Sequence, residues 1–125
     1  MADGERRLLR GPTQVWAALH WSLRGLAECW RHESSFRLEC ALAAVLAPLG
    51  VWLGQTPVER VLLVSSLLAV IAMEVMNSAL EAVADRFGSE RHELIGRAKD
   101  MGSAAVFVLM MNVLVVWGLL LVPRL

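Results

Sequence analysis

The chain has 125 residues, of which 57% are hydrophobic and 19% are charged, and its formal net charge is zero. Typical soluble domains carry about 25% charged residues, and a soluble core this short cannot hide so much apolar surface. The neutral charge balance also excludes the strongly basic surface of a nucleic-acid-binding protein. We therefore expect a membrane protein that has no nucleic-acid partner.

The first predicted element is an amphipathic helix over about residues 13–31, with Thr13 as its N-cap. Polar side chains mostly occupy one of its faces. The other face carries apolar residues at helical spacing, namely Trp16, Leu19, Leu23, Leu26 and Trp30. This pattern predicts a helix that lies on the membrane surface, with its tryptophans at the depth of the headgroups.

Three apolar segments follow, over about residues 34–53, 58–84 and 99–122. Each reaches the roughly 20 residues that a membrane-spanning helix needs, once the turns that flank it are included. A Gly-Gln-Thr-Pro turn at 54–57 separates the first two segments. The predicted fold is an all-α membrane protein with three transmembrane helices and an N-terminal amphipathic surface helix, in a single domain over 1–125.

The basic residues predict the orientation of these spans. Ten of the twelve precede or open the first span or lie between the second and third, whereas Arg60 and Arg124 lie on the opposite side. Because basic residues concentrate in cytoplasmic segments, we expect the N-terminus and the 85–100 segment to face the cytoplasm, where ATP is available.

A stripe of polar residues on the second span is the strongest functional signal. Glu74, Asn77, Glu81 and Asp85 are spaced by three, four and four residues, which places them on one face of a helix. A carboxylate in hydrocarbon costs several kcal/mol, so these side chains must face protein, a partner charge or a bound cation. Pairing with arginines is the structural explanation, but no basic residue lies deep enough inside a span to partner these acids. A role in holding metal or transferring protons is therefore favoured.

Nine of the sixteen residues from 85 to 100 are charged or histidine, a mixture of acids and bases next to the stripe. Charge density alone would also suit a solvated loop, and an isolated His92 is more often a loop residue than a ligand. The sequence has no GxxxxGK[ST], GxGxxG, HRD or DFG motif, so a nucleotide site here must be built differently.

Residues 74–86, with the sequence EVMNSALEAVADR, resemble the ExxNxAxExxxD motif of the prokaryotic diacylglycerol kinase family. The resemblance continues through Gly88-Ser89-Glu90 and through the block GRAKDMGSAAV at 96–106. It extends more weakly over residues 24–26 and 33–37, and so covers most of the chain.

This resemblance implies a lipid kinase of the bacterial cytoplasmic membrane, with diacylglycerol as acceptor, ATP as donor and Mg²⁺ as cofactor. It also implies a homotrimer whose active sites are shared between neighbouring subunits at the cytoplasmic membrane surface. A kinase of the same fold that acts on undecaprenol remains an alternative. A channel or transporter subunit that uses the acids as an ion path, or a purely structural membrane partner, are alternatives of other classes.

Carried over position by position, the resemblance implies that Glu74 is the general base and that Asn77 supports the magnesium site. Glu33 and Glu81 are implied to hold magnesium. The residues implied to bind ATP are Trp21, Glu33, Glu81, Glu90, His92, Lys99 and Asp100, and those implied to bind lipid are Arg60, Glu74 and Ser103. One departure concerns the surface helix, where Gln14 stands in place of the family's arginine, with Arg10 one turn earlier, and Trp21 stands in place of a tyrosine.

Overall fold

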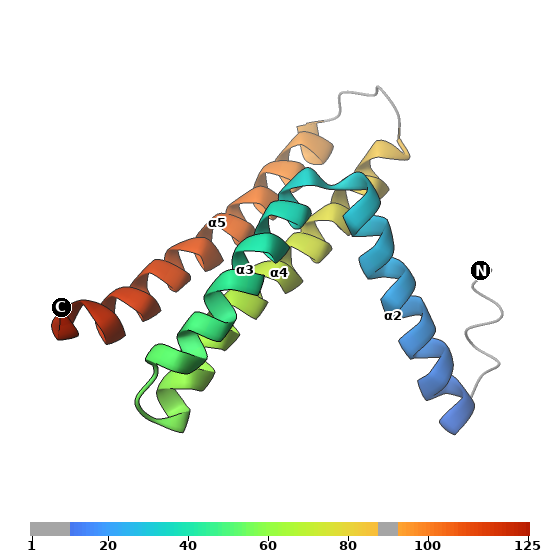
Figure 1. Cartoon of the computed structure of the whole chain (residues 1–125). Coiled ribbons are helices and arrows are strands. Elements are labelled where there is room, and N and C mark those ends of the chain that lie inside the picture. Colours follow the sequence, from blue (N-terminus) through green and yellow to red (C-terminus); the bar gives the residue numbers. More distant parts are fainter. Residues whose placement is uncertain (1–10, 88–92) are drawn as a thin grey trace. The chain divides into compact units, whose positions relative to one another are not determined.

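A computed structural model describes residues 11–87 and 93–125 of the chain. Over these ranges the protein is helical and contains no strand. The chain divides into two compact units, residues 1–32 and 33–125. The first unit contains helix α2 and the second contains helices α3, α4 and α5 (Figure 1).

Helix α2 runs over Pro12–His32. Gly11 precedes it with a positive φ of 67°, and the carbonyl of Gly11 accepts the first hydrogen bonds, from the backbone N–H groups of Gln14 and Val15. Thr13 therefore lies inside the helix rather than at its N-cap, so that detail of the sequence prediction is wrong. The apolar face expected for this helix is exposed within its unit, with Trp16 70% and Trp30 53% accessible.

The second unit contains helices α3 (Ser34–Leu53), α4 (Pro57–Asp85) and α5 (Glu93–Leu121), with a closing 3-10 turn at Val122–Arg124. All three helices are long and apolar enough to cross a membrane. The predicted fold class, an all-α membrane protein with three spanning helices, is confirmed. Helix α4 packs against both α3 and α5 and is therefore the central helix of the unit.

Local sequence explains where α4 begins. The hydroxyl of Thr56 accepts a hydrogen bond of 3.2 Å from the backbone N–H of Glu59, and Pro57 occupies the first helical position. Both choices satisfy or remove N–H groups that a helix start leaves without partners. Gly54 precedes this cap, and a Cβ there would overlap Arg60, so the tight connection from α3 to α4 requires glycine.

Close packing joins the helices near this turn. Leu63 of α4 is fully buried, and a Cβ added at Gly50 of α3 would lie 3.1 Å from the Leu63 Cβ. The indole N–H of Trp117 donates a hydrogen bond of 3.2 Å to the Leu63 carbonyl, which ties α5 to the same point. A small residue on α3 and a large one on α5 thus fit around α4.

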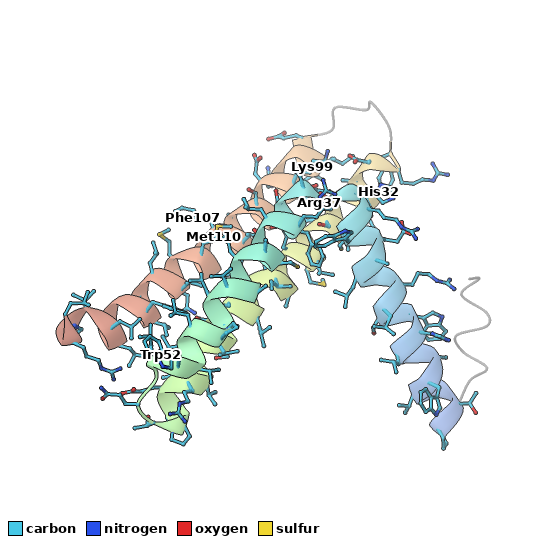
Figure 2. All side chains as sticks on the ribbon, in the orientation of Figure 1. His32, Arg37, Trp52, Lys99, Phe107 and Met110 are labelled. Carbon is cyan, nitrogen blue, oxygen red and sulfur yellow. The ribbon has the colours of Figure 1, made fainter. Side chains whose placement is uncertain are left out.

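The second unit has two distinct ends. The start of α3, the end of α4 and the start of α5 lie at one end, and the α3–α4 turn lies at the other with the chain terminus (Figure 1). Arg37 and Lys99 mark the first end and Trp52 marks the second (Figure 2). The acidic stripe of α4 approaches the first end.

Candidate active site

All three helices of the second unit contribute to a pocket of about 300 Å³ near the end where α3 begins. We call it the acidic pocket because four of its lining residues are glutamates. Its lining comprises Glu33, Ser35, Glu39, Glu74, Asn77, Glu81, Ser103, Val106, Phe107 and Met110. Five residues that the sequence assigned to a site therefore lie together: Glu33, Glu74, Asn77, Glu81 and Ser103.

Glu74 is the most deeply placed acid of this pocket. Only 6% of it is exposed, although it lies in the middle of a spanning helix. Its carboxyl group lies next to that of Glu39 on α3, and both residues line the pocket. Two adjacent carboxylates repel each other and attract a proton or a cation. An acid that meets another acid, rather than an arginine, argues against a purely structural ion pair.

Asn77 lies one turn beyond Glu74 on α4. Its side-chain Nδ2 donates a long hydrogen bond of 3.5 Å to Oε1 of Glu81. The Oδ1 of Asn77 is buried, and no atom of the described residues bonds to it. The amide therefore orients one carboxylate of the pocket.

Lys99 and Asp100 lie on the first turns of α5. They closely precede Ser103 in the sequence but do not themselves line the acidic pocket. The ammonium group of Lys99 forms an ion pair of 2.8 Å with Asp85, the last residue of α4. Asp100 is exposed. This ion pair connects the end of α4 to the first turns of α5.

Of the other predicted site residues, Arg60 lies away from the pocket, Trp21 belongs to the other unit, and two lie outside the described residues. Arg60 lies at the opposite end of α4, where its Nε donates to the Gly54 carbonyl at 3.0 Å and its side chain lines a separate apolar groove. Trp21 belongs to the α2 unit and is half-buried there. Glu90 and His92 lie outside the described residues.

Glu39 is a pocket residue to which the sequence analysis assigned no role. It lies on α3 one helical turn beyond Ser35, its Oε2 is buried, and this atom has no hydrogen-bond partner within residues 11–87 and 93–125. A signal was available, because Glu39 directly precedes the long apolar run of the first span. An acid at that position must face protein for the same reason as Glu74.

The carboxylates of the pocket suit magnesium only in part. Within the described ranges, no three His, Cys, Asp or Glu side chains converge closely enough to form a metal cage. Magnesium, however, is usually held by one or two carboxylates together with phosphate oxygens and water. The hard oxygen donors of Glu33 and Glu81, lining one pocket, fit that mode of binding.

A second pocket, of about 190 Å³, adjoins the acidic pocket and shares Glu39 and Met110 with it. We call it the apolar pocket. The rest of its lining is hydrocarbon, from Leu42, Ala43, Leu46, Leu67, Val70, Ile71 and Val113. The acidic pocket is thus continuous with an apolar pocket whose lining suits hydrocarbon chains.

The fold and the site define a small membrane protein with three apolar spanning helices and a cluster of buried and half-buried acids near one end of them. The sequence pattern described as prokaryotic diacylglycerol kinase matches residues 20–121. The chain belongs to the prokaryotic diacylglycerol kinase family.

Individual relatives agree with this assignment. A diacylglycerol kinase of Haemophilus influenzae is 50% identical over 108 residues, which cover 86% of this chain and 92% of the relative. That of Escherichia coli K12 is 44% identical over 111 residues, covering 89% and 91%. That of Pseudomonas aeruginosa is 39% identical over 111 residues, covering 89% and 90%. The resemblance found in the sequence motifs is confirmed over most of the chain.

Proposed function

We propose that this protein transfers the terminal phosphoryl group of ATP to the free hydroxyl of diacylglycerol, which yields phosphatidic acid and ADP. The observation that carries the proposal is the buried Glu74, which lies in an acidic pocket that adjoins an apolar one. A lipid alcohol has both an apolar chain and a reacting hydroxyl, and these two pockets match the two parts. The names of the relatives support the same substrate.

In the proposed reaction Glu74 is the general base. Its carboxylate accepts the proton of the lipid hydroxyl as the hydroxyl oxygen forms a bond to the γ-phosphorus of ATP. The bond between that phosphorus and the β–γ bridging oxygen breaks, and ADP leaves with the electron pair. Glu39 keeps the Glu74 carboxyl group in place by direct contact across α3 and α4. Asn77 supports the site through its hydrogen bond to Glu81.

Glu33 and Glu81 are the residues that we propose to hold magnesium together with the ATP phosphates. When bound, magnesium neutralises negative charge on the nucleotide and on the phosphoryl group during transfer. The chain's own contribution is to place two carboxylates on one side of the pocket, Glu33 from the start of α3 and Glu81 from α4.

The remaining site residues are proposed for binding. Lys99 and Asp100 at the start of α5, with Glu90, His92 and Trp21, are proposed to bind ATP. Ser103 lines the acidic pocket, where its hydroxyl suits a contact with the glycerol part of the lipid. Arg60 lies at the other end of α4, so any contact it makes is with a distant part of the lipid and not with the reacting hydroxyl.

We further propose that the chain acts as one membrane kinase domain over 1–125 in a homotrimer with active sites shared between subunits. The N-terminus and the acidic pocket face the cytoplasm of a bacterial cell, and α2 lies on the membrane surface. The basic residues of the sequence and the exposed apolar face of α2 support this arrangement.

The reaction is tested with the purified chain in detergent, radiolabelled ATP and magnesium, with diacylglycerol or undecaprenol offered separately. We expect label in phosphatidic acid and at least tenfold slower labelling of undecaprenol. Faster transfer to undecaprenol would change the acceptor within the same fold. The absence of transfer to either alcohol would refute the proposed kinase activity. It would favour instead a channel or transporter subunit or a structural membrane protein.

Shared sites are tested by mixing two variants, each of which we expect to lose activity. Trp21→Ala alters the α2 unit and Glu74→Gln alters the acidic pocket. If an active site combines α2 of one subunit with the pocket of its neighbour, trimers assembled from both variants contain some intact sites and regain part of the activity. Activity no higher than that of the separate variants would contradict sharing.

A further inference from the structure

Gly102 of α5 lies directly against Asn77 of α4, which is a lining residue of the acidic pocket. A Cβ built at Gly102 would overlap Oδ1 of Asn77 and would lie 3.0 Å from Cδ2 of Leu80. A methyl group at this position is therefore accommodated only if the Asn77 amide or the Leu80 side chain shifts. The backbone of α5 can approach the Asn77 amide this closely only because residue 102 has no side chain.

The chemistry of the Asn77 amide explains why this approach matters. Its Nδ2 donates to the Glu81 carboxylate, and the reversed amide would instead place oxygen against oxygen. The Oδ1 must then point away from Glu81, towards Gly102, where it has no hydrogen-bond partner in the described part of the chain. A Cα–H group is a weak donor that tolerates this contact.

We propose that Gly102 is a positioning residue of the active site. The α5 backbone at Gly102 holds the Asn77 amide in one place, and the amide in turn holds the Glu81 carboxylate in the orientation that receives magnesium and ATP. Gly102 itself touches neither substrate. The inference rests on the proposed function, because the role of Glu81 belongs to that proposal.

Two other glycines of the same helix provide matched controls. A Cβ at Gly96 or at Gly118 would have no neighbour within 4 Å among the residues that the structure describes. Alanine is a better helix former than glycine at any of the three positions. Differences between Gly102→Ala and the controls therefore report the contact with Asn77 and not helix propensity.

The first measurement is the affinity for the metal–nucleotide complex, read by Mn²⁺ EPR in the presence of the non-hydrolysable analogue adenylyl-imidodiphosphate. We expect Gly102→Ala to weaken this affinity at least fivefold and to raise the KM for Mg–ATP similarly, with the KM for diacylglycerol unchanged. Gly96→Ala and Gly118→Ala should stay within twofold of the wild type. Wild-type affinity in Gly102→Ala would overturn the inference while leaving the proposed function intact.

The second measurement places Gly102→Ala in an Asn77→Ala background, where the overlapping Oδ1 is gone. We expect no further loss of affinity beyond that of Asn77→Ala alone, because the glycine acts through the asparagine. An equal loss in both backgrounds would overturn the inference, since it would indicate general damage to packing. If Gly102→Ala does not fold, the double variant should, and failure of both would also overturn it.

These outcomes are separable from failure of the proposed function. A wild-type chain that transfers no phosphate to lipid would refute the proposed function, yet the EPR affinity and its dependence on Gly102 and Asn77 could still be measured. If such a chain bound no metal–nucleotide complex either, the inference would fall with the function.

Discussion

The two ends of the three-helix unit treat their acidic side chains in opposite ways. At the turn between α3 and α4, the Glu59 carboxylate is used fully by its own chain. One oxygen pairs with the Arg124 guanidinium at 2.6 Å, and the other accepts the backbone N–H of Gln55 at 2.7 Å. Arg124 also donates to the Leu53 carbonyl at 3.3 Å, so that the chain terminus is fastened to the turn.

Inside the acidic pocket at the other end, the buried acids have no such basic partner, although Asp85 pairs with Lys99 outside its lining. Glu74 meets Glu39 instead of a base, and the buried Oε2 of Glu39 and Oδ1 of Asn77 bond to no atom of the described ranges. Leaving a buried polar group unpaired costs about 1–3 kcal/mol. The comparison teaches that the Glu59 end is built for stability, whereas the acidic pocket keeps bonding capacity for something other than the chain itself.

Replacing one acid at each end by glutamine is the strongest test of this difference between the two ends. Glu74→Gln should lower kcat by about 100-fold or more, because the amide cannot accept the hydroxyl proton. The matched variant Glu59→Gln should lower the melting temperature and leave kcat within about twofold. Kinase assays and thermal unfolding of both variants check this. A Glu74→Gln protein with a tenth of wild-type activity would remove the assigned base.

The proposed metal carboxylates should show the next largest effect. Glu33→Gln and Glu81→Gln should each raise the magnesium concentration for half-maximal activity by about tenfold, equivalent to ~1.4 kcal/mol of binding free energy. Added magnesium should restore part of the rate. Glu93→Gln, which alters an exposed acid paired with Arg97, is the control and should change nothing. Unchanged magnesium dependence in both pocket variants would contradict the metal assignment.

The cap of α4 tests the stabilising end alone. Thr56→Ala removes the hydroxyl that accepts the Glu59 N–H, and should lower the free energy of unfolding by about 1 kcal/mol. Thr56→Ser keeps the hydroxyl and should retain most of that stability. Denaturant titration in detergent measures both. Activity at low temperature should be unaffected, and a specific loss of kcat would show that the two ends are coupled.

The smallest effect is expected from the ion pair between Asp85 and Lys99. Both side chains are substantially exposed, so solvent weakens their attraction. Asp85→Asn should therefore leave the melting temperature unchanged within error. A fall of several degrees would mean that this pair, at the pocket end, fastens the fold as Arg124 does at the other end.

The sequence was most informative where one helix carries the whole signal. Glu74, Asn77 and Glu81 share a face of α4 because helical spacing alone dictates it, and apolar composition predicts three spanning helices. The start of α5 was harder to predict. The helix begins at Glu93, because the charged and small residues before position 99 continue it beyond the apolar segment.

Features that depend on two helices were not predictable from spacing. The contact between Glu39 and Glu74 requires a particular rotation of α3 against α4. The close approach of Gly102 to Asn77 likewise requires a particular rotation of α5 against α4. Neither rotation is encoded in a local pattern. Trp21 illustrates a further limit, since its proposed contact with ATP depends on α2, which belongs to a different unit from the pocket.

The length of α4 has a consequence for how two dissimilar substrates meet. At 1.5 Å per residue its 29 residues extend about 44 Å, whereas the hydrocarbon layer is about 30 Å thick. Measured from Pro57, Glu74 lies about 26 Å along the axis and Glu81 about 36 Å. If the start of the helix marks one boundary of the hydrocarbon layer, the opposite boundary falls between Glu74 and Glu81. Helix α4 would then place the proposed base, Glu74, within the hydrocarbon layer and the proposed metal ligand, Glu81, on the aqueous side. The lipid could therefore stay in the membrane and ATP in water during the reaction.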